Sequence, residues 1–324
     1  MSKAKYTSIG GQALIEGILM KSPEKTTLCV RTSDGGIDTS YMEEKRLAQK
    51  CKIFGWPIIR GVIGFAESLI QGYKALMISA DKSGFTDLEE EKKEKTEEDE
   101  KKESRFLNII MMVGMVLGLA LAVVLFMYLP YWCVSGIEWL CDISIKSKIL
   151  RSGIEQFIKL VVFVGYVWIV SFMKDIKRVF MYHGAEHKTI FCYEKGLELN
   201  VENVRQQKRF HPRCGTSFMI LMILISVIFS TVVQMIYPPI YDFGWIWVTV
   251  KILMVPFICG VGYEVLKACG RYDNFLTRII SAPGMWLQRL TTKEPEDDMI
   301  EIAIAALKAC EPKIPDVERN DDNI

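Results

Sequence analysis

The chain has 324 residues, of which 50% are hydrophobic and 24% are charged, and its formal net charge is +1. Both fractions are too large for one ordinary soluble core, and the two kinds of residue are segregated along the chain, as in a membrane protein with water-exposed ends. The composition therefore argues against a single soluble domain, whereas a net charge near zero says little about partners.

Residues 1–50 are interpreted as a small water-soluble piece that contains β-structure. The stretch TTLCVRTSDGGIDTS has β-favouring runs on either side of Asp34-Gly35-Gly36, which predicts a hairpin. The preceding GGQALIEGILM is a candidate strand, with Gly10 and Gly11 marking a turn. Glu16 is interpreted as a solvent-facing strand residue, and a second functional carboxylate is the alternative. We expect no secretory signal peptide, because the first ten residues are polar and the first apolar run is short and contains a glutamate.

Two segments precede the first long apolar run. Residues 53–80, within segment 51–81, are apolar with a polar residue at every third or fourth position, which is typical of an amphipathic helix. This helix could lie on the membrane or enter it shallowly, or it could pack against other helices, and both alternatives stay open. Glu67 on this helix is a candidate functional carboxylate. Segment 82–105 is interpreted as a solvated linker or a frayed helix, because sixteen of the nineteen residues 87–105 are charged.

Four later stretches are long and apolar enough for membrane-spanning helices, which need ~20 mostly apolar residues. The first two fall in segment 106–173 and the last two in segment 216–266. Their predicted bounds are 106–129, 157–173, 216–237 and 245–266, and the second, which is short, is expected to begin as early as Ile154. The second carries Lys159 near one end, and the fourth carries Lys251 and Glu264. Ionisable groups inside such segments are candidates for function.

Basic residues in the connections predict the orientation of these helices. Segment 174–215 contains nine Lys or Arg, residues 130–153 contain three, and residues 238–244 contain none. Four crossings with both termini in the cytoplasm satisfy this pattern. The C-terminal region 267–324 is then also cytosolic, and acids followed by spaced apolar residues predict a short amphipathic helix over residues 296–310.

All three histidines lie in the cytosolic segment 174–215. His183 and His187, in YHGAEHKTI, are four residues apart, so on a helix they project from one face and could hold one metal ion. Glu186 lies between them, and the order H-x-x-E-H is that of the inverted zinc peptidases, in which the glutamate is the general base. Zinc lowers the pKa of water towards ~7, and a neighbouring carboxylate can collect the proton.

Two histidines make an incomplete site, so a third ligand is needed. His211 is favoured, and Cys214 and Glu264 are rivals, because the predicted topology brings all three to the cytosolic membrane surface. If both His211 and Cys214 joined the two histidines, the site would be closed and structural. Glu186 next to His187 favours an open catalytic site instead.

The stretch RQQKRFHPR is basic and includes Arg213, another candidate. The bias towards basic cytosolic loops and contact with anionic lipid headgroups, worth ~1 kcal/mol per charge, explain it. Binding of RNA, for example on a ribosome, is the less favoured alternative. Membrane lipids are therefore the expected partners, and a protein partner or a second copy of the chain stays open.

Five stretches in this order resemble the YqhQ-like family of bacterial membrane proteins: GGQALIEGILM, YHGAEHKTI, RFHPRCGTSF, VGYEVLK and PGMWLQRLTTKEP. The resemblance runs from residue 9 to about residue 308 and omits the charged linker. The family is described as predicted metal-dependent enzymes, which implies that role for His183, Glu186, His187 and His211. Other motif positions are matched by Gly11, Gln12, Glu16, Gly17, Glu264 and Gln288.

The sequence thus predicts an α-helical integral membrane protein of the bacterial cytoplasmic membrane, with about four transmembrane helices and a small N-terminal β-containing cytosolic piece. The leading hypothesis is a zinc-dependent hydrolase, with another divalent metal as the alternative cofactor. It would act on a peptide or lipid at the cytosolic membrane face, with His183, His187 and His211 as ligands and Glu186 as base. The alternative is a membrane scaffold with a structural metal, active in membrane-protein biogenesis, and transport ranks third.

Overall fold

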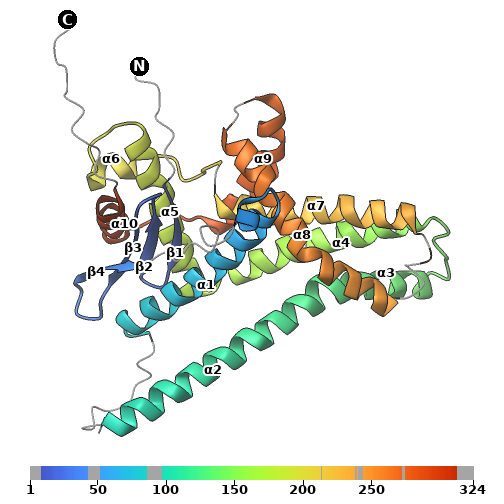
Figure 1. Ribbon diagram of the computed structural model, residues 1–324, viewed down its shortest axis with the longest axis horizontal. Helices are drawn as coiled ribbons and strands as arrows, with labels where there is room; N and C mark the ends of the chain where they lie inside the picture. Colours follow the sequence, from blue (N-terminus) through green and yellow to red (C-terminus); the bar gives the residue numbers. More distant parts are fainter. Residues whose placement is uncertain are drawn as a thin grey trace, which may run out of the picture.

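The computed structural model describes residues 9–42, 52–85, 97–212, 214–237, 239, 244–271 and 274–311. These residues are mostly helical and include one small antiparallel sheet. The sheet, with α5 and α10, lies at one side, and the long apolar helices extend away from it (Figure 1).

The N-terminal sheet is a four-stranded antiparallel meander in the order β1-β2-β3-β4. Its strands are β1 (Gly10–Leu14), β2 (Gly17–Lys21), β3 (Thr26–Arg31) and β4 (Ile37–Met42). The hairpin predicted at Asp34-Gly35-Gly36 joins β3 and β4 and is confirmed, with Gly35 at a φ of 87° that glycine adopts readily.

Two predictions about the first hairpin are wrong. Gly10 and Gly11 lie inside β1 rather than in a turn, and the chain instead reverses at residues 15–16. Glu16 therefore occupies a turn with a φ of 49° rather than a solvent-facing strand position. The alternation of apolar residues could not locate this turn, because ALIEGILM is apolar on both sides of it.

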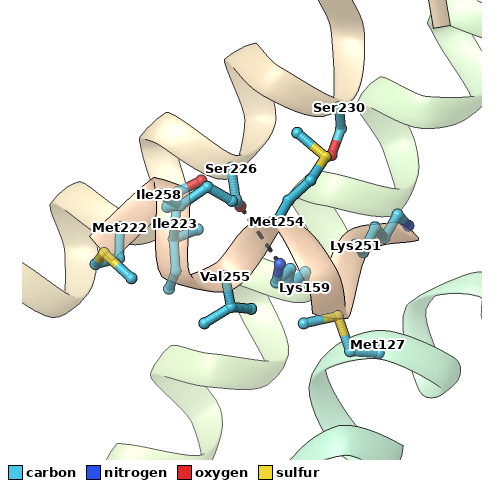
Figure 2. Close-up of a pocket in the computed structure, with 10 residues that line it drawn as sticks. All are labelled: Met127, Lys159, Met222, Ile223, Ser226, Ser230, Lys251, Met254, Val255 and Ile258. Atoms are coloured by element: carbon cyan, nitrogen blue, oxygen red, sulfur yellow. Dashed lines mark hydrogen bonds between the residues drawn. The ribbon is translucent and has the colours of Figure 1, made fainter. Parts of the chain in front are cut away.

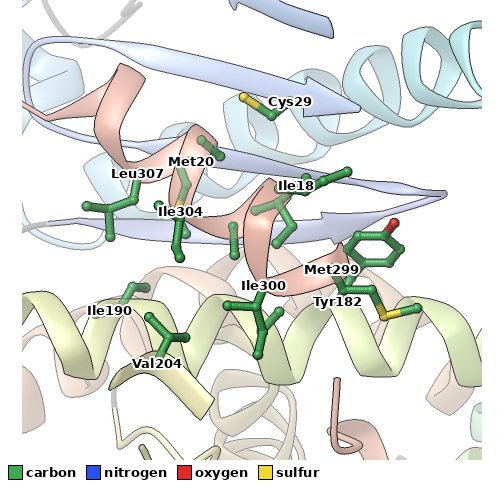
Figure 3. Packing of buried hydrophobic residues seen from close by; sticks show 14 of the residues in the cluster. Ile18, Met20, Cys29, Tyr182, Ile190, Val204, Met299, Ile300, Ile304 and Leu307 are labelled. Atoms are coloured by element: carbon green, nitrogen blue, oxygen red, sulfur yellow. The ribbon is translucent and has the colours of Figure 1, made fainter. Parts of the chain in front are cut away.

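The central strands β2 and β3 are buried on both faces of the sheet, whereas the edge strands β1 and β4 are partly exposed. Ile18, Met20 and Cys29 face α5 (Lys174–Glu194) and α10 (Asp297–Cys310), whose apolar residues complete one core (Figure 3). Leu19 and Leu28, one position along each strand, face α1 (Ile59–Lys82) in a second core. The helix predicted over residues 296–310 is confirmed to within one residue, and burial on nearly all sides makes α10 a core element rather than a surface helix.

Four candidate membrane spans make up the second part of the molecule. Helix α2 (Glu97–Val123) continues through the π-helical η3 (Val124–Tyr128) into α3 (Leu129–Leu140), and the first span covers Met112–Leu140. The others lie in α4 (Lys148–Val170), α7 (Gly215–Ile236) and α8 (Gly244–Arg271). Their spans are Ile149–Val170, Gly215–Ile236 and Trp245–Cys269. All four are long and apolar enough to cross a membrane.

Helix α1 packs against α8, which agrees with one of the two alternatives for residues 53–80, a helix packed against other helices. The short η2 (Lys52–Gly55) precedes α1. Gly61 allows the close contact: a Cβ there would lie 2.9 Å from the backbone of Gly260 and 2.8 Å from Tyr263. Residues 86–96 of the predicted linker lie outside the described part of the chain, and α2 begins at Glu97.

Two remaining helices frame the histidine segment. The short α6 (Val201–Arg205) follows α5, and α9 (Phe275–Thr291) packs across α7 (Figure 1). The contact between α9 and α7 is close, because a Cβ on Gly284 would lie 2.5 Å from the Ser217 side chain. Through this contact α9 places its last turn beside the N-terminus of α7, where the histidine segment also lies.

Candidate metal centre

Three possible ligands meet where α5 approaches the start of α7. His183 and His187 are four residues apart on α5, and their ring centroids are 4.4 Å apart. Cys214 caps the N-terminus of α7. One ligand atom from each of these three residues lies within 4.8 Å of the other two, and the His183 Nε2 to Cys214 Sγ distance is 3.1 Å. Ligands of a tetrahedral zinc with Zn–N near 2.1 Å and Zn–S near 2.3 Å are about 3.6 Å apart, so the spacing suits one ion.

Both imidazoles are oriented by backbone carbonyls. His183 Nδ1 lies 2.8 Å from the Thr291 carbonyl oxygen, and His187 Nδ1 lies 2.5 Å from that of Arg209. A carbonyl oxygen only accepts, so each Nδ1 must carry the proton, and the neutral ring then offers the lone pair of Nε2. This is the arrangement by which outer contacts orient metal-binding histidines. Burial also lowers the pKa of His187, which favours the neutral ring.

His211 was the favoured third ligand, but the structure brings Cys214 into the group instead. The His211 Nε2 lies 3.7 Å from Glu194 Oε2, and its ring packs against Phe191 at 4.7 Å between centroids. Its backbone is held by Gln288, whose amide accepts from the His211 N–H and donates to the His211 carbonyl, each at 2.7 Å. His211 thus lies next to the group, with 5.6 Å between its ring centroid and that of His187.

The other candidates lie elsewhere or have different contacts. Glu264 on α8 forms a bidentate ion pair with Arg60 on α1, with a 2.6 Å contact from Nε to Oε1. Glu67 is half-buried on α1 and does not belong to the histidine–cysteine group of the described chain. Arg213 lies outside the described residues. In the basic stretch, Arg205 pairs with Asp297 and Arg209 with Glu294, so two of its charges are engaged within the protein.

Glu186 is buried beside the histidines, under the first strand. One of its oxygens, Oε2, has no hydrogen-bond partner among the described residues. The backbone N–H of Gly11 donates to the carboxyl. Burial raises the pKa of Glu186 to about 7, although the nearby His183 and the Gly11 hydrogen bond act to lower it. A buried carboxyl with an open oxygen next to two imidazoles is an arrangement typical of functional sites.

Two glycines permit the contacts that build this site. A Cβ on Gly11 would lie 2.8 Å from the Leu19 carbonyl oxygen and 2.9 Å from Glu186 Cδ, so only glycine lets β1 sit on this carboxyl. A Cβ on Gly184 would lie 2.0 Å from the Lys293 carbonyl oxygen. Glycine has a low helix propensity, yet α5 continues through Gly184. The missing side chain at Gly184 lets the segment after α9 pass close to this helix.

Glu16 forms a contact that the sequence did not reveal. Its carboxylate receives a bidentate pair from Arg178, with a 2.7 Å contact to Nη2, and accepts from the Tyr182 hydroxyl at 3.0 Å. Burial tends to raise the pKa of Glu16, but the hydrogen bonds and charge of Arg178 outweigh it and hold the pKa below its usual value. Glu16 therefore ties the first hairpin to α5, one turn before His183.

Comparison with known proteins gives the family. A family model described as "Protein of unknown function (DUF1385)" matches residues 56–313, which include every candidate ligand. The chain belongs to this family. It is also 33% identical to "Uncharacterized protein YqhQ" of Bacillus subtilis (strain 168) over 306 residues, 94% of this chain and 92% of the relative. No solved structure matches the chain. The resemblance to the YqhQ-like family is thereby confirmed.

Proposed function

We propose that this protein is a zinc-dependent hydrolase that acts at the cytosolic face of the bacterial cytoplasmic membrane. The observation that carries the proposal is the group of His183, His187 and Cys214, with both Nδ1 atoms bound to backbone carbonyls. Nitrogen and sulfur donors are the set that zinc prefers. Three protein ligands leave a fourth tetrahedral position for water or substrate, which is the pattern of catalytic rather than closed zinc sites.

Each residue has a separate role in this proposal. When bound, zinc supplies a Lewis acid and lowers the pKa of water towards ~7. His183, His187 and Cys214 would hold the ion, and the carbonyls of Thr291 and Arg209 keep the two imidazole rings in place. Glu186 takes the proton from the attacking water through its open oxygen and passes it to the leaving group. The strand that covers Glu186 limits access of bulk water to this carboxyl.

The position of the site supports a membrane-surface substrate. Cys214 directly precedes the span Gly215–Ile236, and α5 begins four residues after the span that ends at Val170. The site thus lies at one end of two candidate spans, and the basic residues of segment 174–215 favour the cytosolic side. A peptide or a lipid presented at that surface is the substrate class that fits.

The test begins with elemental analysis of the detergent-purified protein. We expect one equivalent of zinc in the wild type and none in the His183→Ala/His187→Ala variant. Cys214→Ser should lower the zinc content, whereas Glu186→Gln should keep it while abolishing hydrolysis of labelled casein or of a fluorogenic phospholipid. A wild type that binds no zinc, even when zinc is resupplied under reducing conditions, would refute the proposal.

A scaffold with a structural metal is the second candidate, and the position of His211 favours it. Its ring lies 5.6 Å from that of His187, so a modest rotation could bring a fourth ligand to the ion and close the site. Zinc content of His211→Ala separates the two functions. Loss of zinc in this variant indicates the closed structural site, and retention of zinc indicates the open site of a hydrolase.

A further inference from the structure

Lys159 lies at the middle of a candidate span, not near its end as the sequence suggested. It is ten residues after the first residue and eleven before the last of Ile149–Val170. With a rise of 1.5 Å per residue, its Cα is about 15 Å from either end of that helix. Lysines near the ends of a span can extend to the interface, but this position is too deep for that. Intramembrane ionisable residues are costly and mark functional sites.

The other buried charges near it are paired. Arg151 binds Glu138 at 2.9 Å, and Lys251 forms a buried ion pair with Glu155. Among the described residues, no carboxylate oxygen lies within ion-pair distance of Lys159, whose ammonium group donates a long 3.4 Å hydrogen bond to the Ser226 hydroxyl. Ser226 occupies the middle of its own span, Gly215–Ile236. Glu155, one turn before Lys159 on α4, attracts this ammonium group but is already paired with Lys251. The two ammonium groups of Lys159 and Lys251 therefore share this carboxylate, and the interior around Lys159 has an excess of positive charge.

This ammonium lines a cavity of about 150 Å³ between α4, α7, α8 and η3 (Figure 2). Ser226 and Ser230 add hydroxyl groups to the polar side of the cavity. Lys251, which is ion-paired with Glu155, also lines it. The remaining wall is apolar and rich in methionine, a flexible side chain that adapts to different shapes. A charged end and an apolar wall within one cavity match an amphiphilic anion.

A polar stripe on α7 continues from this cavity. Ser226, Ser230 and Gln234 follow one another at intervals of four residues and so share one face of the helix. Gln234 is buried, and neither its amide nitrogen nor its amide oxygen has a hydrogen-bond partner within the described part of the chain. Buried polar groups are ordinarily satisfied, so this stripe points to a polar occupant or to water in the same interior space.

We propose that this cavity binds a carboxylate or phosphate group carried on an apolar chain. Lys159 supplies the charge, Ser230 donates a hydrogen bond, and the methionine-rich wall contacts the chain. Ser226, whose hydroxyl donates to the Ile223 carbonyl at 2.7 Å, accepts from Lys159 and so orients its ammonium group. The site is separate from the metal centre: Ser226 lies twelve residues along the chain from Cys214, which corresponds to about 18 Å of helix. The proposal goes beyond the proposed hydrolase and holds whether or not zinc binds.

Binding of radiolabelled dodecanoate to delipidated protein in a neutral detergent tests this assignment. We expect saturable binding of one molecule, weakened by about tenfold or more in Lys159→Met, because a charged hydrogen bond is lost. Lys159→Arg should bind like the wild type. Lys267→Met is the matched control, because Lys267 lies on α8, is exposed, and does not line the cavity.

A parallel titration with inorganic phosphate distinguishes a lipid-borne anion from a free one. Weak, Lys159-dependent competition by phosphate supports an amphiphilic ligand. A protein that binds phosphate but does not bind dodecanoate would overturn the proposal that the ligand carries an apolar chain. Dodecanoate should also raise the unfolding temperature of the wild type but not of Lys159→Met. Equal dodecanoate binding by both proteins, or a ligand-free Lys159→Met that unfolds earlier than the wild type, would overturn the site.

Discussion

Gly184→Ala tests how the site is assembled, because it adds one methyl group at the glycine that has the closest neighbour among the glycines of the described chain. The new Cβ would lie 2.0 Å from the Lys293 carbonyl oxygen, whereas ordinary C···O contacts are ~3.3–3.6 Å. Helix α5 and the segment after α9 must therefore separate by about 1.3 Å. Thr291, two residues before Lys293, would move with it and stretch its 2.8 Å hydrogen bond to His183 beyond the usual range.

The expected cost follows from these changes. Overpacking of this kind costs about 1–3 kcal/mol, and loss of the hydrogen bond adds about 1 kcal/mol. The gain in helix propensity from Gly to Ala returns up to ~1 kcal/mol. We expect Gly184→Ala to lower the free energy of unfolding by about 1–3 kcal/mol and to weaken zinc binding.

The control for this variant is Gly153→Ala, in which the added methyl group meets no atom within 4 Å, so that only the helix propensity changes. Chemical unfolding in detergent, followed by circular dichroism, measures both variants beside the wild type. A Gly184→Ala protein that is as stable as Gly153→Ala, with unchanged zinc affinity, would refute the close approach of the two backbones and with it the proposed orientation of His183.

Three further predictions concern the contacts around the site and the bundle. Gly11→Ala should lower stability by about 1–3 kcal/mol because its Cβ meets the Leu19 carbonyl and Glu186, whereas Gly10→Ala meets no atom within 4 Å and should be nearly neutral in thermal unfolding. The lowered pKa of Glu16 predicts stability that is present above its ordinary value of 4.5 and lost as the pH falls through the folded value; Glu16→Gln should flatten that pH dependence in urea titrations. Lys251→Met should destabilise the protein by about 3–5 kcal/mol because it removes the ammonium group that is ion-paired with the buried carboxylate of Glu155, and adding Glu155→Gln should recover most of the loss.

Local patterns in the sequence located several elements of the fold. Gly35 in Asp34-Gly35-Gly36 adopts the positive φ that its turn requires, and the spacing of apolar residues marked α10 to within one residue. The four apolar runs corresponded to candidate spans, since length and composition alone decide that pattern. The span around Lys159 begins five residues before the predicted start at Ile154, because Arg151 and Glu155 find partners inside the bundle.

The details of the site depend on contacts between distant segments, which no local pattern contains. The spacing of His183 and His187 predicted that their side chains project from one face, and α5 confirms it. The choice between His211 and Cys214 depended on Gln288, whose amide fixes the His211 backbone from α9, 77 residues away. That helix was expected only as part of a helical region, because Pro283 interrupts the pattern of its sequence.

The stretch YHGAEHK shows why the histidines are concentrated in one short segment. Tyr182 binds Glu16 of the first hairpin, Gly184 admits the backbone at Lys293, and Glu186 lies under Gly11. Within about one turn of α5, three residues therefore contact three different parts of the chain, and these contacts set the direction of His183 and His187. The family match begins at residue 56, yet two of these contacts come from residues before it. The N-terminal sheet is consequently part of the candidate metal centre, because without it Glu186 would lose its cover and α5 its contact with Glu16.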